Sequence, residues 1–192
     1  MSETTQTDGR RQRADQSRRR IALAMLELAR AGEVAPSAEQ VADAAGVGRR
    51  TVFRLFTDMD GVYREMHAVM VERIAPMFSA PFVATTWRAK VDELIERRAR
   101  MFEEMQPIKS AADIHRHRSM FLQKGHRQVT KLQRETLLGV LPERIRADEE
   151  LINALDLSFC FESWRRMRLE QRLPIKDAIA TWRRLARALL GE

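Results

Sequence analysis

The segment SAEQVADAAGVGRRTVFRLF, from Ser37 to Phe56, constrains the fold of this chain most strongly. Its apolar residues are spaced as on two short helices, and Gly46 stands between them, where a tight turn needs a backbone that tolerates a positive φ. Ser37 and Gln40 have the spacing of a capping box, which predicts the start of the first helix. The small side chain of Ala42 suits a close helix crossing. We therefore expect two short helices joined by a turn.

The second of these helices is expected to have two different faces. Val52, Leu55 and Phe56 turn inward in this interpretation. The opposite face combines three arginines with one aromatic ring: Arg49, Arg50, Phe53 and Arg54. Arginine bonds guanine bidentately in the major groove of DNA, and an aromatic edge contacts the thymine methyl group. This face is typical of a helix that reads DNA, and the alternative is a solvated basic face on a small bundle.

No segment alternates as a strand, so the sequence predicts an all-α fold. Residues 1–14 are polar without an apolar period, which predicts a disordered basic arm. Apolar spacing, with proline and glycine as breaks, divides the remaining chain into helices. We expect these helices at about 15–31, 38–45, 49–56, 60–78, 85–105, 108–123, 126–140, 148–171 and 175–190.

The composition limits the classes of protein to which this chain can belong. Hydrophobic residues make up 44% of the chain and charged residues 32%, as in a globular protein. No stretch approaches the ~18 consecutive apolar residues that a membrane-spanning helix needs. The first twenty residues lack the apolar region of a secretory signal, and the single Cys160 excludes an intrachain disulfide. We therefore expect a cytoplasmic protein that does not enter a membrane.

The net charge of +7 favours an anionic partner, and the basic residues of the N-terminal segment gather in two patches, one between residues 10 and 20 and one at Arg49, Arg50 and Arg54. Between residues 10 and 20 the sequence has six arginines and one acidic residue, Asp15. Arg18, Arg19 and Arg20 lie at the start of the first expected helix, so we expect them to contact phosphates. The arm before them either enters a minor groove of the DNA or adds only a non-specific, salt-sensitive attraction to DNA.

The segment from about residue 15 to 70 resembles the N-terminal domain of the TetR family of transcriptional regulators. The resemblance rests on the run TVFRLF at 51–56 and on DGV at 60–62, where the next helix opens. It implies a helix-turn-helix DNA-binding domain over residues 15–60, with three helices. It also implies a larger helical effector-binding and dimerisation domain over residues 61–192. A family member of this kind is a dimeric repressor that binds palindromic double-stranded DNA and is released by a small molecule.

Three positions depart from the family pattern. Phe53 stands where a tyrosine is common, Met59 where a lysine is common, and Gly48 where a serine or threonine often caps the helix. Each departure removes a contact to the DNA backbone. Hydroxyls near the helix starts, those of Ser37 and Thr51, suit phosphates. The residues expected at DNA are Arg18, Arg19, Arg20, Ser37, Gly48, Arg49, Arg50, Thr51, Phe53 and Arg54.

The segments 148–171 and 175–190 carry apolar residues at helical spacing. The resemblance implies that these last helices pair with their copies in a homodimer, which would present two reading heads to a palindromic operator. The alternative is the core of a single chain, because periodicity does not separate core from interface. The residues expected at the interface are Leu155, Phe159, Trp164, Ile179, Trp182 and Leu189.

Flexible and aromatic side chains on inward stripes are candidates for an effector pocket, with ordinary core packing as the alternative. They are Met66, Met70, Met101, Phe102, Met105, Met120, Phe121 and Phe161. Nothing in the sequence names the effector.

The segment DIHRHR, residues 113–118, suggests a metal site only at first sight. On a helix His115 and His117 point about 200° apart, so only Asp113 and His117 share a face. We expect no metal and no cofactor. The sequence also lacks a Ser/His/Asp grouping and a phosphate-binding glycine loop, so we expect no enzyme. The alternative to a regulator is an architectural or protein-interaction bundle that binds DNA without sequence preference.

Overall fold

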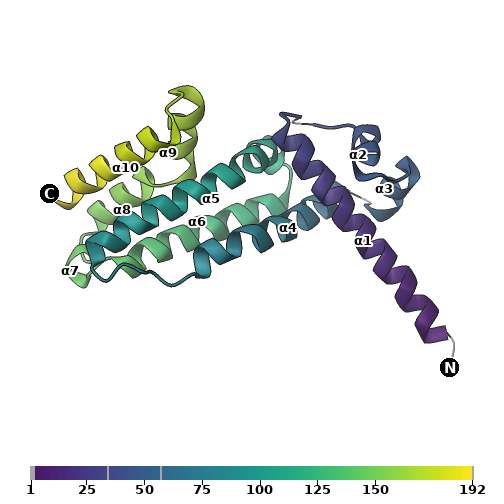
Figure 1. Ribbon diagram of the computed structural model, residues 1–192, viewed down its shortest axis with the longest axis horizontal. Helices are drawn as coiled ribbons and strands as arrows, with labels where there is room; N and C mark the ends of the chain where they lie inside the picture. Colours follow the sequence, from purple (N-terminus) through teal and green to yellow (C-terminus); the bar gives the residue numbers. More distant parts are fainter. Residues whose placement is uncertain (1–2, 34, 57, 192) are drawn as a thin grey trace. The chain divides into compact units, whose positions relative to one another are not determined.

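The computed structural model describes residues 3–33, 35–56 and 58–191. Every regular element within these ranges is a helix, and none is a strand (Figure 1). The prediction of an all-helical chain is therefore confirmed. Among the described residues, no helix combines the length and the apolar character that crossing a membrane requires.

The helices follow the predicted order, with differences at α1, at α5, at α6, which runs through the break predicted at Gly125, at α7, which is not predicted, and in the segment after residue 148. Their bounds are α1 (Glu3–Arg30), α2 (Ala38–Ala45), α3 (Arg49–Leu55), α4 (Met59–Ser79), α5 (Trp87–Arg116), α6 (Met120–Val140), α7 (Glu143–Arg146), α8 (Glu149–Ser158), α9 (Phe161–Arg165), the π-helix η1 (Arg166–Glu170) and α10 (Ile175–Leu190).

Helix α1 begins at Glu3, so it includes most of the segment for which the sequence predicts a disordered arm. Exposed local contacts occur along this part of α1. The Nε of Arg13 donates to the carbonyl of Gly9 at 3.0 Å, and Arg18 pairs with Asp15 at 3.0 Å. Contacts between residues three or four apart support exposed helices.

Helix α5 continues through Pro107, where the sequence predicts a break. A proline removes one backbone hydrogen bond and costs about 3 kcal/mol in a helix interior. Packing on both sides of the proline offsets that cost, because Phe102 and Met105 are buried before it and Ile108 packs against a core after it.

The predicted single helix over 148–171 is divided between α8 and α9. The hydroxyl of Ser163 donates to the carbonyls of Ser158 and Cys160, at 2.5 and 3.0 Å. The Sγ of Cys160 accepts the backbone N–H of Ser163 at 3.4 Å and so caps α9. Side chains that bond nearby backbone groups compete with continued helix.

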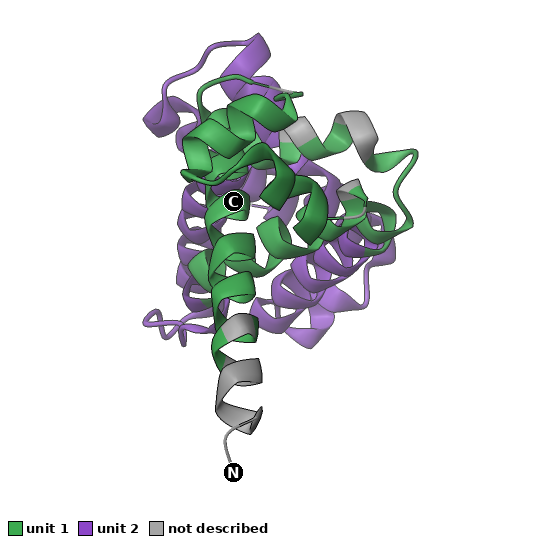
Figure 2. Ribbon diagram, turned by 90° about the vertical axis from the view of Figure 1, so that its right-hand side faces the viewer, with its two compact units in different colours: residues 1–75, 107–124 green, residues 76–106, 125–192 purple. Residues whose placement is uncertain are grey.

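The chain forms two compact units, which Figure 2 distinguishes by colour. Unit 1 comprises residues 1–75 and 107–124, and unit 2 comprises residues 76–106 and 125–192. The sequence places the division at residue 60 instead. The difference arises because the first four turns of α4 belong to the core of unit 1, to which they contribute Val62, Met66 and Val69.

The core of unit 1 joins α1, α2, α3 and α4. Its most buried members are Ile21, Ala22, Leu26, Val41, Ala42, Val62 and Val69. The small Ala42 is 3% exposed and belongs to this core.

The core of unit 2 is built around aromatic rings. The rings of Trp164 and Trp182 lie 4.7 Å apart, and Phe102 and Phe159 each meet Trp182 edge-on. Such pairs add to the free energy gained by burial alone. Four residues for which the sequence predicts a dimer interface lie here, at most 1% exposed: Leu155, Phe159, Trp164 and Trp182. For these four residues the alternative interpretation applies: they belong to the core of a single chain.

Candidate nucleic-acid interface

Helix α2 starts at the capping box that the sequence predicts. The hydroxyl of Ser37 accepts the backbone N–H of Gln40 at 3.2 Å, and the side-chain oxygen of Gln40 accepts the N–H of Ser37 at 2.8 Å. Two N–H groups that the helix itself does not satisfy are thereby bonded. Ser37 is exposed, and its hydroxyl is engaged in holding the helix start.

The turn after α2 depends on Gly46, whose φ of 61° and ψ of 40° lie in the left-handed region. Its N–H donates to the carbonyl of Asp43 at 3.1 Å, and the N–H of Val47 donates to that of Ala42 at 3.0 Å. This pair of bonds is the Schellman arrangement, which ends a helix in one defined direction. The turn therefore holds α3 at a fixed angle to α2.

Helix α3 follows with Gly48 before its first residue, in an extended conformation and without a side-chain cap. The N–H of Thr51 reaches the carbonyl of Gly48 at 2.7 Å. Val52 is buried, and Leu55 and Phe56 pack against the core of unit 1. The prediction that these three residues face inward is confirmed.

The opposite face of α3 is open to solvent. Phe53 is 59% exposed, and Arg49, Arg50 and Arg54 are exposed beside it. The guanidinium of Arg49 lies over the Phe53 ring. None of the three arginines forms an ion pair with a described residue. The face therefore carries positive charge that no carboxylate of the described chain neutralises.

The three arginines of α1 that the sequence assigns to phosphates have different surroundings. Arg18 pairs with Asp15. Arg19 bonds both carboxylate oxygens of Glu72, at 3.0 and 2.6 Å. This hydrogen-bonded pair raises the pKa of Arg19 and lowers the pKa of Glu72. Arg20 is exposed and forms no ion pair with a described residue.

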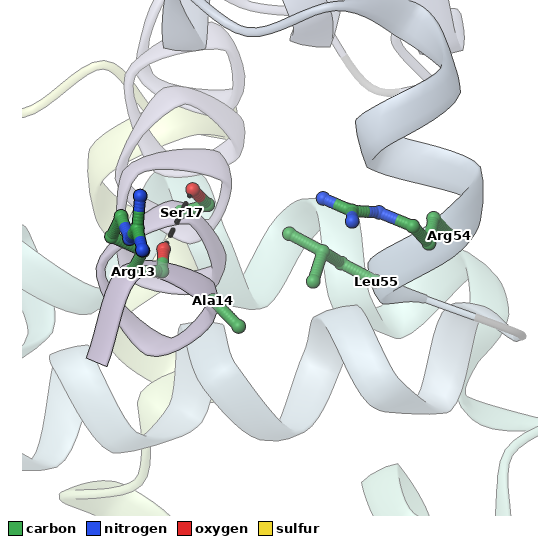
Figure 3. A pocket seen from close by; sticks show the side chains of 5 residues that line it. All are labelled: Arg13, Ala14, Ser17, Arg54 and Leu55. Atoms are coloured by element: carbon green, nitrogen blue, oxygen red, sulfur yellow. Dashed lines mark hydrogen bonds between the residues drawn. The ribbon is translucent and has the colours of Figure 1, made fainter. Parts of the chain in front are cut away.

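A hollow of about 460 Å³ lies between α1 and α3 (Figure 3). Arg13, Ala14 and Ser17 line it from α1, and Arg54 and Leu55 line it from α3, with the Arg54 side chain extending toward α1. Arg13 is absent from the sequence-based set of DNA contacts, because the sequence places it in a disordered arm. The sequence signal that could have placed Arg13 on a helix is the continuous run of helix-compatible residues before Ser17.

Helix α4 opens after α3 with Asp58 as its cap, since a carboxylate oxygen of Asp58 accepts the N–H of Gly61 at 2.7 Å. The neighbouring Asp60 accepts the hydroxyl of Ser119 at 2.6 Å. The side chain of Met59, one of the departures from the family pattern, lies outside the described residues.

The candidate effector residues are divided between the two units. Met66, Met70, Met120 and Phe121 belong to unit 1, and Met101, Phe102, Met105 and Phe161 belong to unit 2. Their exposure ranges from 0% at Phe102 to 80% at Met120. In unit 2 a cavity of about 30 Å³ is lined by Met101.

The segment 113–118 is held by ion pairs. The Asp113 carboxylate lies 3.6 Å from the Lys109 ammonium and 3.4 Å from the Arg116 guanidinium. The side chain of His115 lies outside the described residues. Within the described part of the chain, no group of three or more His, Cys, Asp or Glu side chains is placed to hold a metal ion.

No protein-family model matches the chain, and a search of curated proteins gives no significant match.

Proposed function

We propose that this protein is a sequence-specific DNA-binding transcriptional regulator of the TetR type, with α2 and α3 as its helix-turn-helix. The observation that carries the proposal is the exposed face of α3. Three guanidinium groups and one aromatic ring stand together there without a described carboxylate partner. Desolvating such a face against protein would be costly, whereas the major groove offers guanine acceptors and thymine methyl groups.

The scaffold under that face supports the proposal. The capping box fixes the start of α2, the Schellman turn at Gly46 fixes its end, and Val52 anchors α3 in the core of unit 1. A reading helix needs such rigid support, because base contacts demand close positioning. Arg20 is the α1 arginine best suited to a phosphate, since Arg18 and Arg19 are already paired with Asp15 and Glu72.

A homodimer would present two copies of α3 to an inverted repeat. Unit 2 offers exposed apolar residues on α8 and α10 for such pairing: Leu157 is 73% exposed and Leu185 is 39% exposed. Ile179 and Leu189 of α10, for which the sequence predicts a place at the interface, are half-buried, whereas Leu157 and Leu185 are not in that predicted set. A small-molecule effector would release the repressor by favouring a state whose two reading helices no longer fit successive major grooves.

The test is selection of bound fragments from sheared genomic DNA at near-physiological salt, with wild-type protein and the Arg50→Ala variant in parallel. We expect the wild type to enrich a short inverted repeat. The variant should lose preference at one base pair of each half-site. Equal recovery of unrelated fragments by both proteins would contradict sequence reading.

One observation favours a second function, an architectural protein that binds DNA without sequence preference. Helix α3 lacks a side-chain cap at Gly48, and Phe53 has no hydroxyl for a phosphate. Backbone anchoring is therefore weaker than the family pattern implies. The same selection separates the two functions, because an architectural protein would be retained on DNA yet enrich no sequence.

A further inference from the structure

The hollow between α1 and α3 is lined by positive charge without a carboxylate. Of its five lining residues, Arg13 and Arg54 are charged and none is acidic. Neither guanidinium forms an ion pair with a described residue. The acid nearest to Arg13 in the sequence, Asp15, is paired with Arg18. An anion therefore enters the hollow without repulsion from its lining, whereas a cation is repelled.

The two arginines are the hydrogen-bond donors that the hollow offers to a ligand. The Nε of Arg13 donates to the carbonyl of Gly9 at 3.0 Å, which leaves its Nη groups without a described partner. Arg54 donates to no described residue. The hydroxyl of Ser17 donates to the carbonyl of Arg13 at 2.9 Å, so its proton is already used. Guanidinium groups match the oxygens of a phosphate in charge and in geometry.

Arg54 lies on the side of α3 that is nearest to α1. A helix turns by about 100° per residue, so Arg54 lies about 100° around α3 from Leu55, which lines the hollow. The Arg54 side chain extends toward α1 (Figure 3). Phe53 lies about 200° around the helix from Leu55, and its ring holds the guanidinium of Arg49. The exposed face of α3 therefore has two parts, with Arg49 and Phe53 on one side and Arg54 on the side of α1.

The hollow has the size and the lining of a site for nucleic-acid backbone. Its volume of about 460 Å³ lies within the range of about 300–1,000 Å³ that ligand sites span. Arg13 and Arg54 are both exposed, so the cationic groups are open to solvent. Ala14 and Leu55 add apolar surface, against which a sugar ring can pack. An open site with cations and an apolar lining suits a strand of alternating phosphates and sugars.

We propose that the hollow between α1 and α3 binds one strand of the DNA backbone, with Arg13 and Arg54 bonding its phosphates. This inference rests on the DNA binding of the proposed function, and it assigns Arg54 to the backbone instead of the bases. A helix in the major groove has a phosphate strand along each side, so an element beside α3 is placed to meet one of them. Phosphate contacts fix the position of the protein and carry no base information. Arg49, Arg50 and Phe53 then remain to read bases.

The first experiment measures the affinity of the full chain for a short duplex of arbitrary sequence over a series of salt concentrations. Arg13→Ala and Arg54→Ala should each reduce the slope of log affinity against log salt by about one unit, and the double variant by about two. The melting temperature should not change, because both side chains are exposed. An unchanged slope in Arg54→Ala would overturn the proposal.

The matched control is Arg11→Ala. Arg11 is exposed on α1, does not line the hollow, and lies about 200° around the helix from Arg13. Its removal changes the net charge equally and should leave the slope nearly unchanged. A loss of slope as large as that of Arg13→Ala would mean that the charge of α1 acts only through its general field, and would overturn the site.

Fragment selection with Arg54→Ala separates a backbone contact from base reading. We expect the variant to enrich the same inverted repeat as the wild type, with the same preference at every base pair and a lower affinity. A preference lost at one base pair would make Arg54 a base contact, which would overturn this inference and support the proposed function. If the wild type enriches no sequence, the reading of DNA fails, and the salt slopes on arbitrary DNA still decide whether the hollow holds backbone.

A free phosphate is the other possible source of the same chemistry. Pyrophosphate is therefore titrated into the DNA-free protein by calorimetry at near-physiological salt. We expect no saturable binding, because salt screens exposed charges and a free anion lacks the other contacts of a bound duplex. Saturable binding that is lost in Arg13→Ala and Arg54→Ala, together with unchanged salt slopes on DNA, would assign the hollow to a free phosphate and overturn its assignment to DNA.

Discussion

The guanidinium carbon of Arg49 lies 5.7 Å from the centre of the Phe53 ring, on the exposed face of α3. The ring therefore orients an arginine that would otherwise move freely. Such a contact contributes about 0.5–1 kcal/mol at an exposed site. Phe53→Ala should weaken binding to a selected DNA fragment about two- to fivefold, measured by fluorescence anisotropy. The melting temperature should not change, because the ring is 59% exposed. A lowered melting temperature with unchanged DNA affinity would assign Phe53 a structural role instead.

Base contacts and phosphate contacts should respond differently to mutation. Arg50→Ala should cost about 1–3 kcal/mol on the preferred sequence and little on others. Arg20→Ala should weaken binding to all sequences alike and reduce the salt slope by about one unit. Arg19→Ala is the matched comparison for Arg20, because Arg19 is bonded to Glu72 in the free protein and should matter less. Identical salt slopes for the Arg20 and Arg50 variants would contradict these roles.

The two glycines that flank the turn should respond oppositely to the same substitution. Gly46→Ser places a side chain at a φ of 61° and should lower the free energy of unfolding by about 1–2 kcal/mol. At Gly48 φ is −69°, and the nearest atom to an added Cβ is the Thr51 hydroxyl at 3.9 Å. Gly48→Ser supplies the missing cap and should raise the free energy of unfolding by a few tenths of a kcal/mol. Urea denaturation measures the free energy of unfolding of both variants. Equal changes in the two variants would contradict the turn geometry.

The hydrogen bonds that attach the loop 80–86 to Glu93 of α5 should depend on pH. Hydrogen bonds from Ala84, Arg97 and Val83 keep the pKa of Glu93 below its ordinary value of 4.5. Because the folded pKa is the lower one, the contribution of Glu93 is complete above pH 4.5 and is lost as the pH falls through the folded pKa. Amide exchange at Val83 and Ala84, as protection factors, should stay constant from pH 7 to 5 and drop only at a pH below 4.5. Glu93→Gln should remove this pH dependence, and its persistence in that variant would exclude Glu93 as the cause.

A dimer through α8 and α10 should depend on exposed leucines and not on the buried aromatic core. Leu157→Glu combined with Leu185→Glu should give a monomer by light scattering, with unchanged helix content. Val83→Glu is the control, because Val83 is 88% exposed on the loop between α4 and α5. A wild-type monomer, or a double variant that stays dimeric, would contradict this interface.

Local signals in the sequence determined the pair of short helices α2 and α3. The capping box of Ser37 and Gln40, the turn at Gly46 and the inward set around Val52 all depend on neighbours within a few residues. Such features form wherever the local chemistry permits, so their sequence spacing suffices to predict them. The all-helical class follows likewise from the apolar period of 3.6 residues.

Features that depend on distant residues were decided by the tertiary structure. Periodicity marks Trp164 and Trp182 as apolar, but only their packing within one chain shows that they are core, whereas Leu157 and Leu185 stay exposed. The bonds of Arg98 to Gln133 and Phe159 span 35 and 61 residues. The sequence by itself determined the all-helical class and which face of α3 is basic, whereas the packing of distant helices decided which side chains are buried, because burial is a property of the whole fold.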